Sequence, residues 1–374
     1  VQDRIAAGDH AALPMQAKLL ELADARFRTA AAGDLQEPRN LDALLVYGMS
    51  GGNPATVQAA AARVKLDDAD RAVVDGVVAY LSGDPVRATA ALNDVEPMAL
   101  PVDLSAFVAL VKGSLLAAEE PAKALALFDR ARLVSPGTLV EEAALRRSVR
   151  IAAATGDAGR FLLASTQYVA RFLHSPYASQ FADSFVSGVV ALHADVGFDR
   201  LVEITSMMDA EREKVIYLRI ARRAAIDGLS ELSAFASARA GKIEAGEDDD
   251  PRAQLYSSLS SLTSESIAAV RDGLERIDRA RLSENDRALL DAARTITREV
   301  VAPPPAEDTA QEQPAAAPAA SPPVPSAAPP AADGTAAAAA AAGAEPASDP
   351  TEDAIADARR KLETIDRMLG DSPL

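Results

Sequence analysis

The sequence predicts an all-α protein, built as a solenoid of helical hairpins. Helical apolar periodicities, separated by turn residues, recur every 31 to 41 residues along most of the chain. Hydrophobic residues make up 49% of the chain, but aromatic residues make up only 4% and Trp is absent. Small core side chains suit closely stacked helices better than β-sheets. The period and the composition together favour one elongated array over several globular domains.

The clearest hairpin runs from Pro121 to Thr155. The apolar stripe of its first helix consists of Ala124, Leu127, Phe128, Ala131 and Leu133. Pro136-Gly137 cannot continue this helix. Thr138 and Glu141 have the spacing of a capping box, in which the hydroxyl accepts a main-chain N–H and the carboxylate reaches back to the N-cap N–H. Glu141 is therefore interpreted as a helix cap and not as a catalytic acid.

Similar turns repeat along the chain. The turn residues are Gly52, Gly83, Glu119, Gly156, Gly197 and Gly228. Asn53, Asp84 and Asp157 follow three of them as N-cap residues. Pro54 and Pro85 then occupy the first helical position, where proline is tolerated. Each turn therefore predicts the junction between two helices of one hairpin.

The type of repeat follows from the spacing A-x3-F-x2-A-x4-P, which is that of the second helix of a tetratricopeptide repeat. It is formed by Ala124, Phe128, Ala131 and Pro136, with partial matches at Gly76, Ala88, Leu92 and Val95 and at Ala152, Ala164, Tyr168 and Pro176. Small residues there allow helices to cross closely, and the large residue fills the gap to the next hairpin. The Trp of that repeat is missing and unit lengths vary, so the repeats are described as tetratricopeptide-like.

Three regions are predicted: a helical-repeat domain over 1–301, a disordered linker over 302–349 and a short C-terminal helix over 350–370. Pro303–Pro350 is rich in Pro and Ala and cannot bury a core. The apolar seam of the last segment consists of Ile355, Ala358, Leu362, Ile365 and Leu369. This seam would dock either on the array or on another protein, and the sequence leaves the choice open.

Composition excludes several functions. The net charge of −17 comes without a basic stripe, which argues against binding nucleic acid. Cysteine is absent, so disulfides, thiolate nucleophiles and cysteine metal sites are excluded. No uninterrupted apolar run of about 20 residues occurs, so no membrane span is expected. The chain begins Val1-Gln2, which is compatible with a removed signal peptide but does not establish one.

No enzyme or cofactor site is predicted. His10, His174 and His193 are not at metal-ligand spacing. The acidic loop Glu247–Asp250 lacks the alternating ligands of a calcium loop. The common nucleophile and phosphate-binding signatures are also missing.

Two groups of arginines are the candidate partner-binding residues. Arg146 and Arg150 form the first group, and Arg219, Arg222 and Arg223 form the second. Each group lies on the first helix of a hairpin, the helix that lines the concave face in such solenoids. Two interpretations stay open: a solvated charged face that balances local acids, or a surface that binds the carboxylates of a partner.

Several runs resemble the motility protein C (MotC) family. They are Leu44–Pro54, Ser135–Arg147, Gly156–Phe172 and Leu282–Ala293, and the resemblance covers roughly Gln2–Val301. It implies a periplasmic protein of the flagellar motor that binds the periplasmic part of the stator protein MotB. No catalytic residues are implied.

The leading hypothesis is therefore a non-enzymatic periplasmic scaffold that supports motor rotation. The alternative is a general periplasmic tetratricopeptide-type adaptor in cell-envelope assembly. A cell-wall hydrolase would need a separate catalytic domain, for which no segment remains. The oligomeric state and the face that binds a partner are not predicted.

Overall fold

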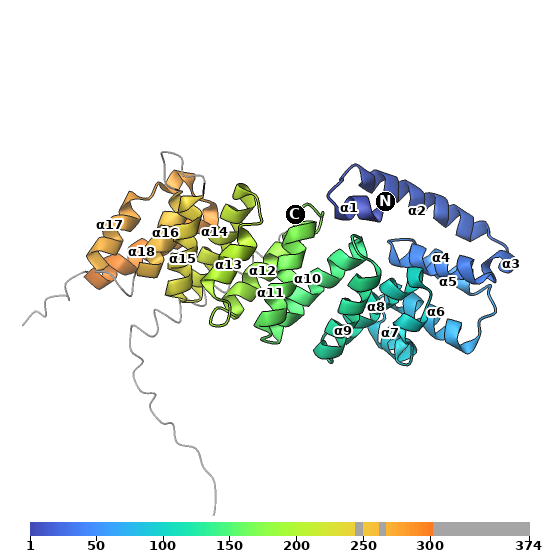
Figure 1. Ribbon diagram of the computed structural model, residues 1–374. Coiled ribbons are helices and arrows are strands. Elements are labelled where there is room, and N and C mark those ends of the chain that lie inside the picture. Colours follow the sequence, from blue (N-terminus) through green and yellow to red (C-terminus); the bar gives the residue numbers. More distant parts are fainter. Residues whose placement is uncertain (244–249, 262–266, 302–374) are drawn as a thin grey trace, which may run out of the picture. The chain divides into compact units, whose positions relative to one another are not determined.

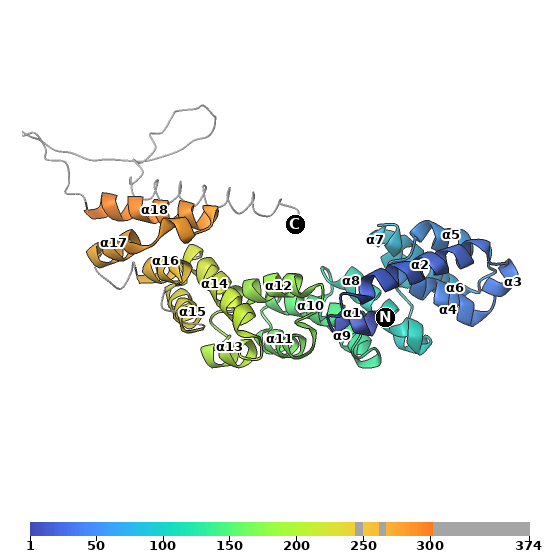
Figure 2. The same ribbon diagram turned by 90° about the horizontal axis from the view of Figure 1, so that it is seen from above.

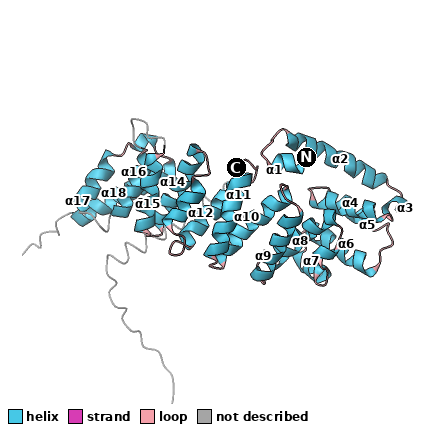
Figure 3. Ribbon diagram, in the orientation of Figure 1, coloured by secondary structure: helices cyan, strands magenta, loops and turns pink. Residues whose placement is uncertain are grey.

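The computed structural model describes residues 1–243, 250–261 and 267–301. Within these ranges regular structure is entirely helical, which confirms the all-α prediction (Figures 1 and 3). The helices are α1 (Gln2–Ala6), α2 (Ala12–Thr29), α3 (Ala32–Leu35), α4 (Pro38–Met49), α5 (Pro54–Ala61), α6 (Asp68–Leu81), α7 (Pro85–Leu92), η1 (Pro97–Ala99), α8 (Val102–Leu116), α9 (Pro121–Val134), α10 (Leu139–Ala154), α11 (Ala158–Phe172), α12 (Ala178–Ala191), α13 (Phe198–Thr205), α14 (Ala210–Ile226), α15 (Ser230–Lys242), α16 (Pro251–Ser260), α17 (Ile267–Arg276), η3 (Arg279–Arg281) and α18 (Glu284–Val301).

Successive helices pack as hairpins. Helices α6 and α7, α8 and α9, α10 and α11, and α14 and α15 form the closest pairs, each joined by a short turn (Figures 1 and 2). The first helices of neighbouring hairpins also contact one another, in the order α8, α10, α12, α14 and α16. We call these five the A helices. The predicted hairpin solenoid is thus confirmed for the described part of the chain.

The turns between paired helices form for the local reasons predicted from the sequence. The side chains of Asn53, Asp84 and Asp157 each accept a main-chain N–H from the first turn of the following helix. Gly83 and Gly156 have φ values of +74° and +76°, a left-handed conformation that costs glycine little. A glycine stop followed by an acidic or amide cap therefore defines each of these junctions.

The junction between α9 and α10 differs in two details from its prediction. Thr138 Oγ1 accepts the N–H of Val140 and of Glu141, as expected for an N-cap. The Glu141 carboxylate, however, accepts the N–H of Gly137 at 2.6 Å and not that of Thr138. Leu133 is 75% exposed, so the prediction that it widens the buried stripe was wrong. Periodicity alone does not show how wide a stripe the neighbouring helices cover.

Close crossings between neighbouring helices explain three glycines of the repeats. Gly76 on α6 faces Leu92 on α7, and Gly113 on α8 faces Phe128 on α9, each within one hairpin. Gly188 on α12 faces Phe161 on α11, the second helix of the preceding hairpin. A Cβ atom at Gly188 would lie 2.2 Å from Cε2 of Phe161, well inside van der Waals contact. Small residues thus lie where helices cross closely, as expected, whereas the tetratricopeptide-like type of the repeat stays a prediction.

The N-terminal helices connect hairpins that are far apart in the sequence. Helix α1 packs on α10, and α2 packs on α5 and α4 (Figure 1). Gln2 Nε2 donates to Ser50 Oγ at 2.9 Å at the end of α4. His10 Nε2 lies 3.3 Å from the carbonyl oxygen of His174, between α11 and α12. The first helix therefore holds the early hairpins against the middle of the array.

The negative charge of Asp42 on α4 is predicted to lower the stability of the fold. Burial, followed by repulsion from Asp70 and Asp103, raises the pKa of Asp42. Ionised Asp42 therefore disfavours the folded state, and this cost appears as the pH rises through its folded pKa. We expect Asp42→Asn to raise the free energy of unfolding at pH 7 by about 0.5 kcal/mol, since solvent screens a partly exposed group. Urea denaturation at pH 7 and pH 3 checks this, because the gain should vanish once the carboxyl is protonated in both states.

Some predictions lie outside the described residues. They concern the linker over 302–349, the C-terminal helix over 350–370 and most of the acidic loop Glu247–Asp250. These domain boundaries stay predictions. Among the described helices, none combines the length and apolarity needed to cross a bilayer.

Candidate partner-binding surface

The predicted arginines lie on two A helices, α10 and α14, as the hairpin pattern indicated. Helix α12 packs against both of them. Apolar residues of α10 and α14 are buried in the core, and the arginines occupy other positions on these two helices. The two groups therefore belong to one row of three adjacent helices.

Arg146 is held by residues of its own and neighbouring helices. Its Nε lies 3.0 Å from Glu142 Oε1, and its Nη2 lies 3.3 Å from Glu142 Oε2. Its Nη1 donates to Gln180 Oε1 at 2.6 Å, and the guanidinium lies 5.2 Å from the centre of the Tyr177 ring. Because Gln180 and Tyr177 belong to α12 and its N-cap, Arg146 fixes α12 against α10.

Glu142 joins Arg146 to the core. Its side chain is buried and also accepts the hydroxyl of Tyr168 on α11 at 2.7 Å. Burial, and then the nearby Glu142 carboxylate, raise the pKa of Tyr168 far above its usual range. Sequence reasoning missed this buried network. The spacing of Glu142 and Arg146 by four residues was a signal for it, since such pairs share a helix face.

The arginines of α14 are also paired with acids of this chain. Arg219 pairs with Asp183 on α12; the Asp183 side chain is largely exposed and that of Arg219 is partly exposed. Arg222 Nε lies 3.4 Å from Oδ1 of buried Asp286 at the start of α18. Arg223 Nε lies 2.9 Å from Asp227 Oδ2 in the same segment of chain. Arg222 thus holds α18 against α14, whereas the Arg219 pair remains open to solvent.

Arg150 differs from the other four. It is exposed, and it has no hydrogen bond or ion pair to the described residues. The structure thus divides the five predicted arginines into four that are paired within the chain and one that is not. Whether they bind a partner stays a prediction.

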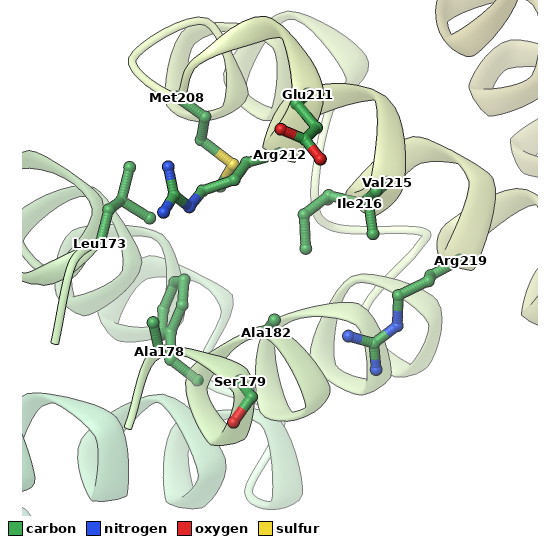
Figure 4. Close-up of a pocket in the computed structure, with 11 residues that line it drawn as sticks. Leu173, Ala178, Ser179, Ala182, Met208, Glu211, Arg212, Val215, Ile216 and Arg219 are labelled. Atoms are coloured by element: carbon green, nitrogen blue, oxygen red, sulfur yellow. The ribbon is translucent and has the colours of Figure 1, made fainter. Parts of the chain in front are cut away.

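A pocket of about 370 Å³ lies between α12 and α14 (Figure 4). It is lined by Leu173, Ala178, Ser179, Phe181, Ala182, Met208, Glu211, Arg212, Val215, Ile216 and Arg219. Val215 is 44% exposed although it is apolar, and Arg219 projects at one end of the pocket. The sequence did not reveal this pocket, because it is formed by two helices that another helix, α13, separates in the chain.

The described residues offer no metal-binding cluster. No group of three His, Cys, Asp or Glu side chains among them could hold a metal ion. His193 Nδ1 contacts the main-chain carbonyl of Val190 at 3.0 Å, which is a structural role. Asp250 caps α16 and pairs with Lys214 and Arg252. An apolar pocket with charged edges is instead suited to binding a protein segment.

Comparison with known proteins gives the family. The family model described as "Chemotaxis protein MotC" matches residues 1–373. The chain belongs to the MotC family. A "Chemotaxis protein MotC" of Rhizobium meliloti (strain 1021) is 40% identical over 315 residues, which are 83% of this chain and 72% of that protein.

The MotC family match confirms the resemblance seen in the sequence. It also extends past Val301, so the Pro- and Ala-rich segment and the last 20 or so residues are part of the matched region. No solved structure is significantly similar.

Proposed function

We propose that this chain is a non-enzymatic scaffold of the flagellar motor, which acts in the periplasm and supports motor rotation by binding the periplasmic part of the stator protein MotB. The observation that carries the proposal is membership of the MotC family over residues 1–373. A row of stacked hairpins also suits this function, because solenoids offer extended surfaces for binding proteins.

The pocket between α12 and α14 is the proposed binding surface. Its volume of about 370 Å³ falls within the ~300–1,000 Å³ of ligand pockets in proteins. Binding would bury the exposed side chain of Val215, and burial of apolar surface favours association. Tyr177, which is 39% exposed at the N-cap of α12, extends the surface toward Arg146.

The arginines divide into two roles in this proposal. Arg150 and Arg219 contact acidic residues of the partner. The exposed pair of Arg219 and Asp183 contributes little to stability, so exchanging Asp183 for a partner carboxylate costs little. Arg146 holds α12 against α10, Arg222 holds α18 against α14, and Arg223 pairs with Asp227 at the end of its own helix.

Val215→Asp tests this surface. The new carboxylate would have to be desolvated on binding, so we expect affinity for the purified periplasmic domain of MotB to fall at least tenfold. Calorimetric titration measures the affinity, and a swimming assay in a deletion strain complemented with each variant measures function. Val86→Asp is the matched control. Val86 is 78% exposed and lies on α7, the second helix of a hairpin that is far in the sequence from the pocket.

Normal swimming of the deletion strain would contradict the motor role. Envelope defects with intact swimming would favour the adaptor in cell-envelope assembly. Unchanged MotB affinity of Val215→Asp, with folding intact by circular dichroism, would exclude this pocket as the contact surface.

A further inference from the structure

One face of α14 carries a cation at each end of the pocket between α12 and α14. Arg212 and Arg219 both line this pocket, and so do Val215 and Ile216 between them. The four positions follow the i, i+3, i+4, i+7 spacing that places side chains on one face of a helix. The rise of an α-helix separates the two arginines by about 10 Å along α14. Figure 4 shows their guanidinium groups at different edges of the pocket.

Both arginines form ion pairs that are open to solvent. Arg212 pairs with Asp209, Arg219 pairs with Asp183, and all four side chains are at least 39% exposed. Pairs exposed to this degree contribute little to stability, so each arginine can exchange its acid for another at little cost. Asp209 also accepts the main-chain N–H of Arg212 at 2.9 Å, so it keeps a donor when the Arg212 side chain leaves.

The surface between the two arginines suits an apolar side chain. Val215 is 44% exposed there, and the buried side chains of Phe181 and Ile216 line the pocket as well. Glu211 is the one acid among the lining residues, and it would repel a carboxylate placed between the arginines. The pocket therefore presents a cation, an apolar surface and a second cation in order along α14.

The walls of the pocket favour a helical partner over an extended one. Both walls are helices, and beyond their first turns the main-chain groups bond within each helix. They cannot pair with the main chain of an extended segment as the edge of a sheet does. Such a segment would lose water from its N–H and C=O groups without gaining partners. A helix satisfies these groups internally.

We propose that the pocket binds an amphipathic helix of a partner protein, in which two acidic residues seven positions apart flank a large apolar residue. The carboxylates bind Arg212 and Arg219 in place of Asp209 and Asp183, and the apolar side chain packs on Val215. Hydrogen bonds between arginine and carboxylate are directional, so the spacing of the acids sets the specificity. The inference rests on the proposed function, because it takes this pocket as the contact surface for the partner.

Calorimetric titration of the full-length chain with three alanine-rich helical peptides tests the proposal. The first peptide has Glu at positions i and i+7 and Leu at i+3 and i+4. The second has Gln in place of both Glu, and the third moves the second Glu to i+5, which faces away from the first. We expect the first peptide to bind about tenfold more tightly than the second and about threefold more tightly than the third. Equal affinities for the three peptides would overturn the proposal.

Variants of the chain show whether the two arginines recognise the acids. The double variant Arg212→Gln, Arg219→Gln should bind the Glu and Gln peptides equally, with folding checked by circular dichroism. Arg200→Gln is the matched control and should keep the tenfold preference. Arg200 is an exposed arginine of α13 that pairs with Glu203 three residues ahead and does not line the pocket. A preference that survives in the double variant would contradict the proposed recognition.

The peptide experiment is separate from the test of the motor role, because no motor protein takes part in it. A tenfold preference together with normal swimming of the deletion strain would refute the motor role and support the recognition of acidic helices. Reduced swimming of the deletion strain together with equal peptide affinities would refute the recognition and leave the motor role standing.

Discussion

Replacing Glu142 by alanine is expected to lower the free energy of unfolding by about 3–5 kcal/mol, the usual cost of removing one partner of a buried ion pair. Glu142 is fully buried. Its carboxylate accepts hydrogen bonds from Nε and Nη2 of Arg146 and, at 2.7 Å, from the Tyr168 hydroxyl. Its loss leaves a cation and a phenol without their acceptor at the contact of α10, α11 and α12. Urea denaturation monitored by circular dichroism measures the change.

Tyr168→Phe is the graded control for Glu142→Ala. It removes one hydroxyl but keeps the ring, which stacks on Phe181 at 4.0 Å between ring centres. Because the Glu142 carboxylate keeps Arg146, the loss should be only about 1 kcal/mol. A Glu142→Ala variant no less stable than Tyr168→Phe would contradict the structural role assigned to Glu142.

Gly188→Ala is expected to cost about 1–3 kcal/mol, the usual penalty for overpacking a core. The added methyl group would lie 2.2 Å from Cε2 of Phe161, which is itself buried and stacked on Phe185 at 5.7 Å. Phe161 cannot move away without breaking that stack. The same denaturation experiment detects the loss.

Gly241→Ala is the matched control and should have the opposite sign. Gly241 is also in a helix, α15, but apart from its chain neighbours and its own helix backbone no atom of the described residues lies within 4 Å of a Cβ at this position. Alanine should therefore stabilise the helix, by about 0.5 kcal/mol, through its better helix propensity. If both substitutions destabilised the protein equally, the crossing of α12 with α11 would not be the cause.

The sequence predicted the helical junctions well because their chemistry is local. Thr138, Asp84 and Asp157 cap helices by accepting N–H groups two or three residues ahead, and such contacts depend only on nearby residues. The family could be recognised for a similar reason, since several of its runs are cap and turn segments. The positions of the predicted arginines on first helices follow from the same hairpin pattern.

The candidate site was less predictable, because its contacts join distant parts of the chain. Arg219 pairs with Asp183, 36 residues away, and Arg222 pairs with Asp286 on the last described helix. No spacing rule relates these positions.

The sequence by itself determined the helices, their junctions, the hairpin period and the family. Only the tertiary structure decided which side chains are buried and which charges are paired, such as exposed Leu133 and paired Arg146. The physical reason is how far along the chain each interaction reaches. Capping and helical periodicity act within a few residues, whereas burial and ion pairing depend on the neighbours that packing supplies.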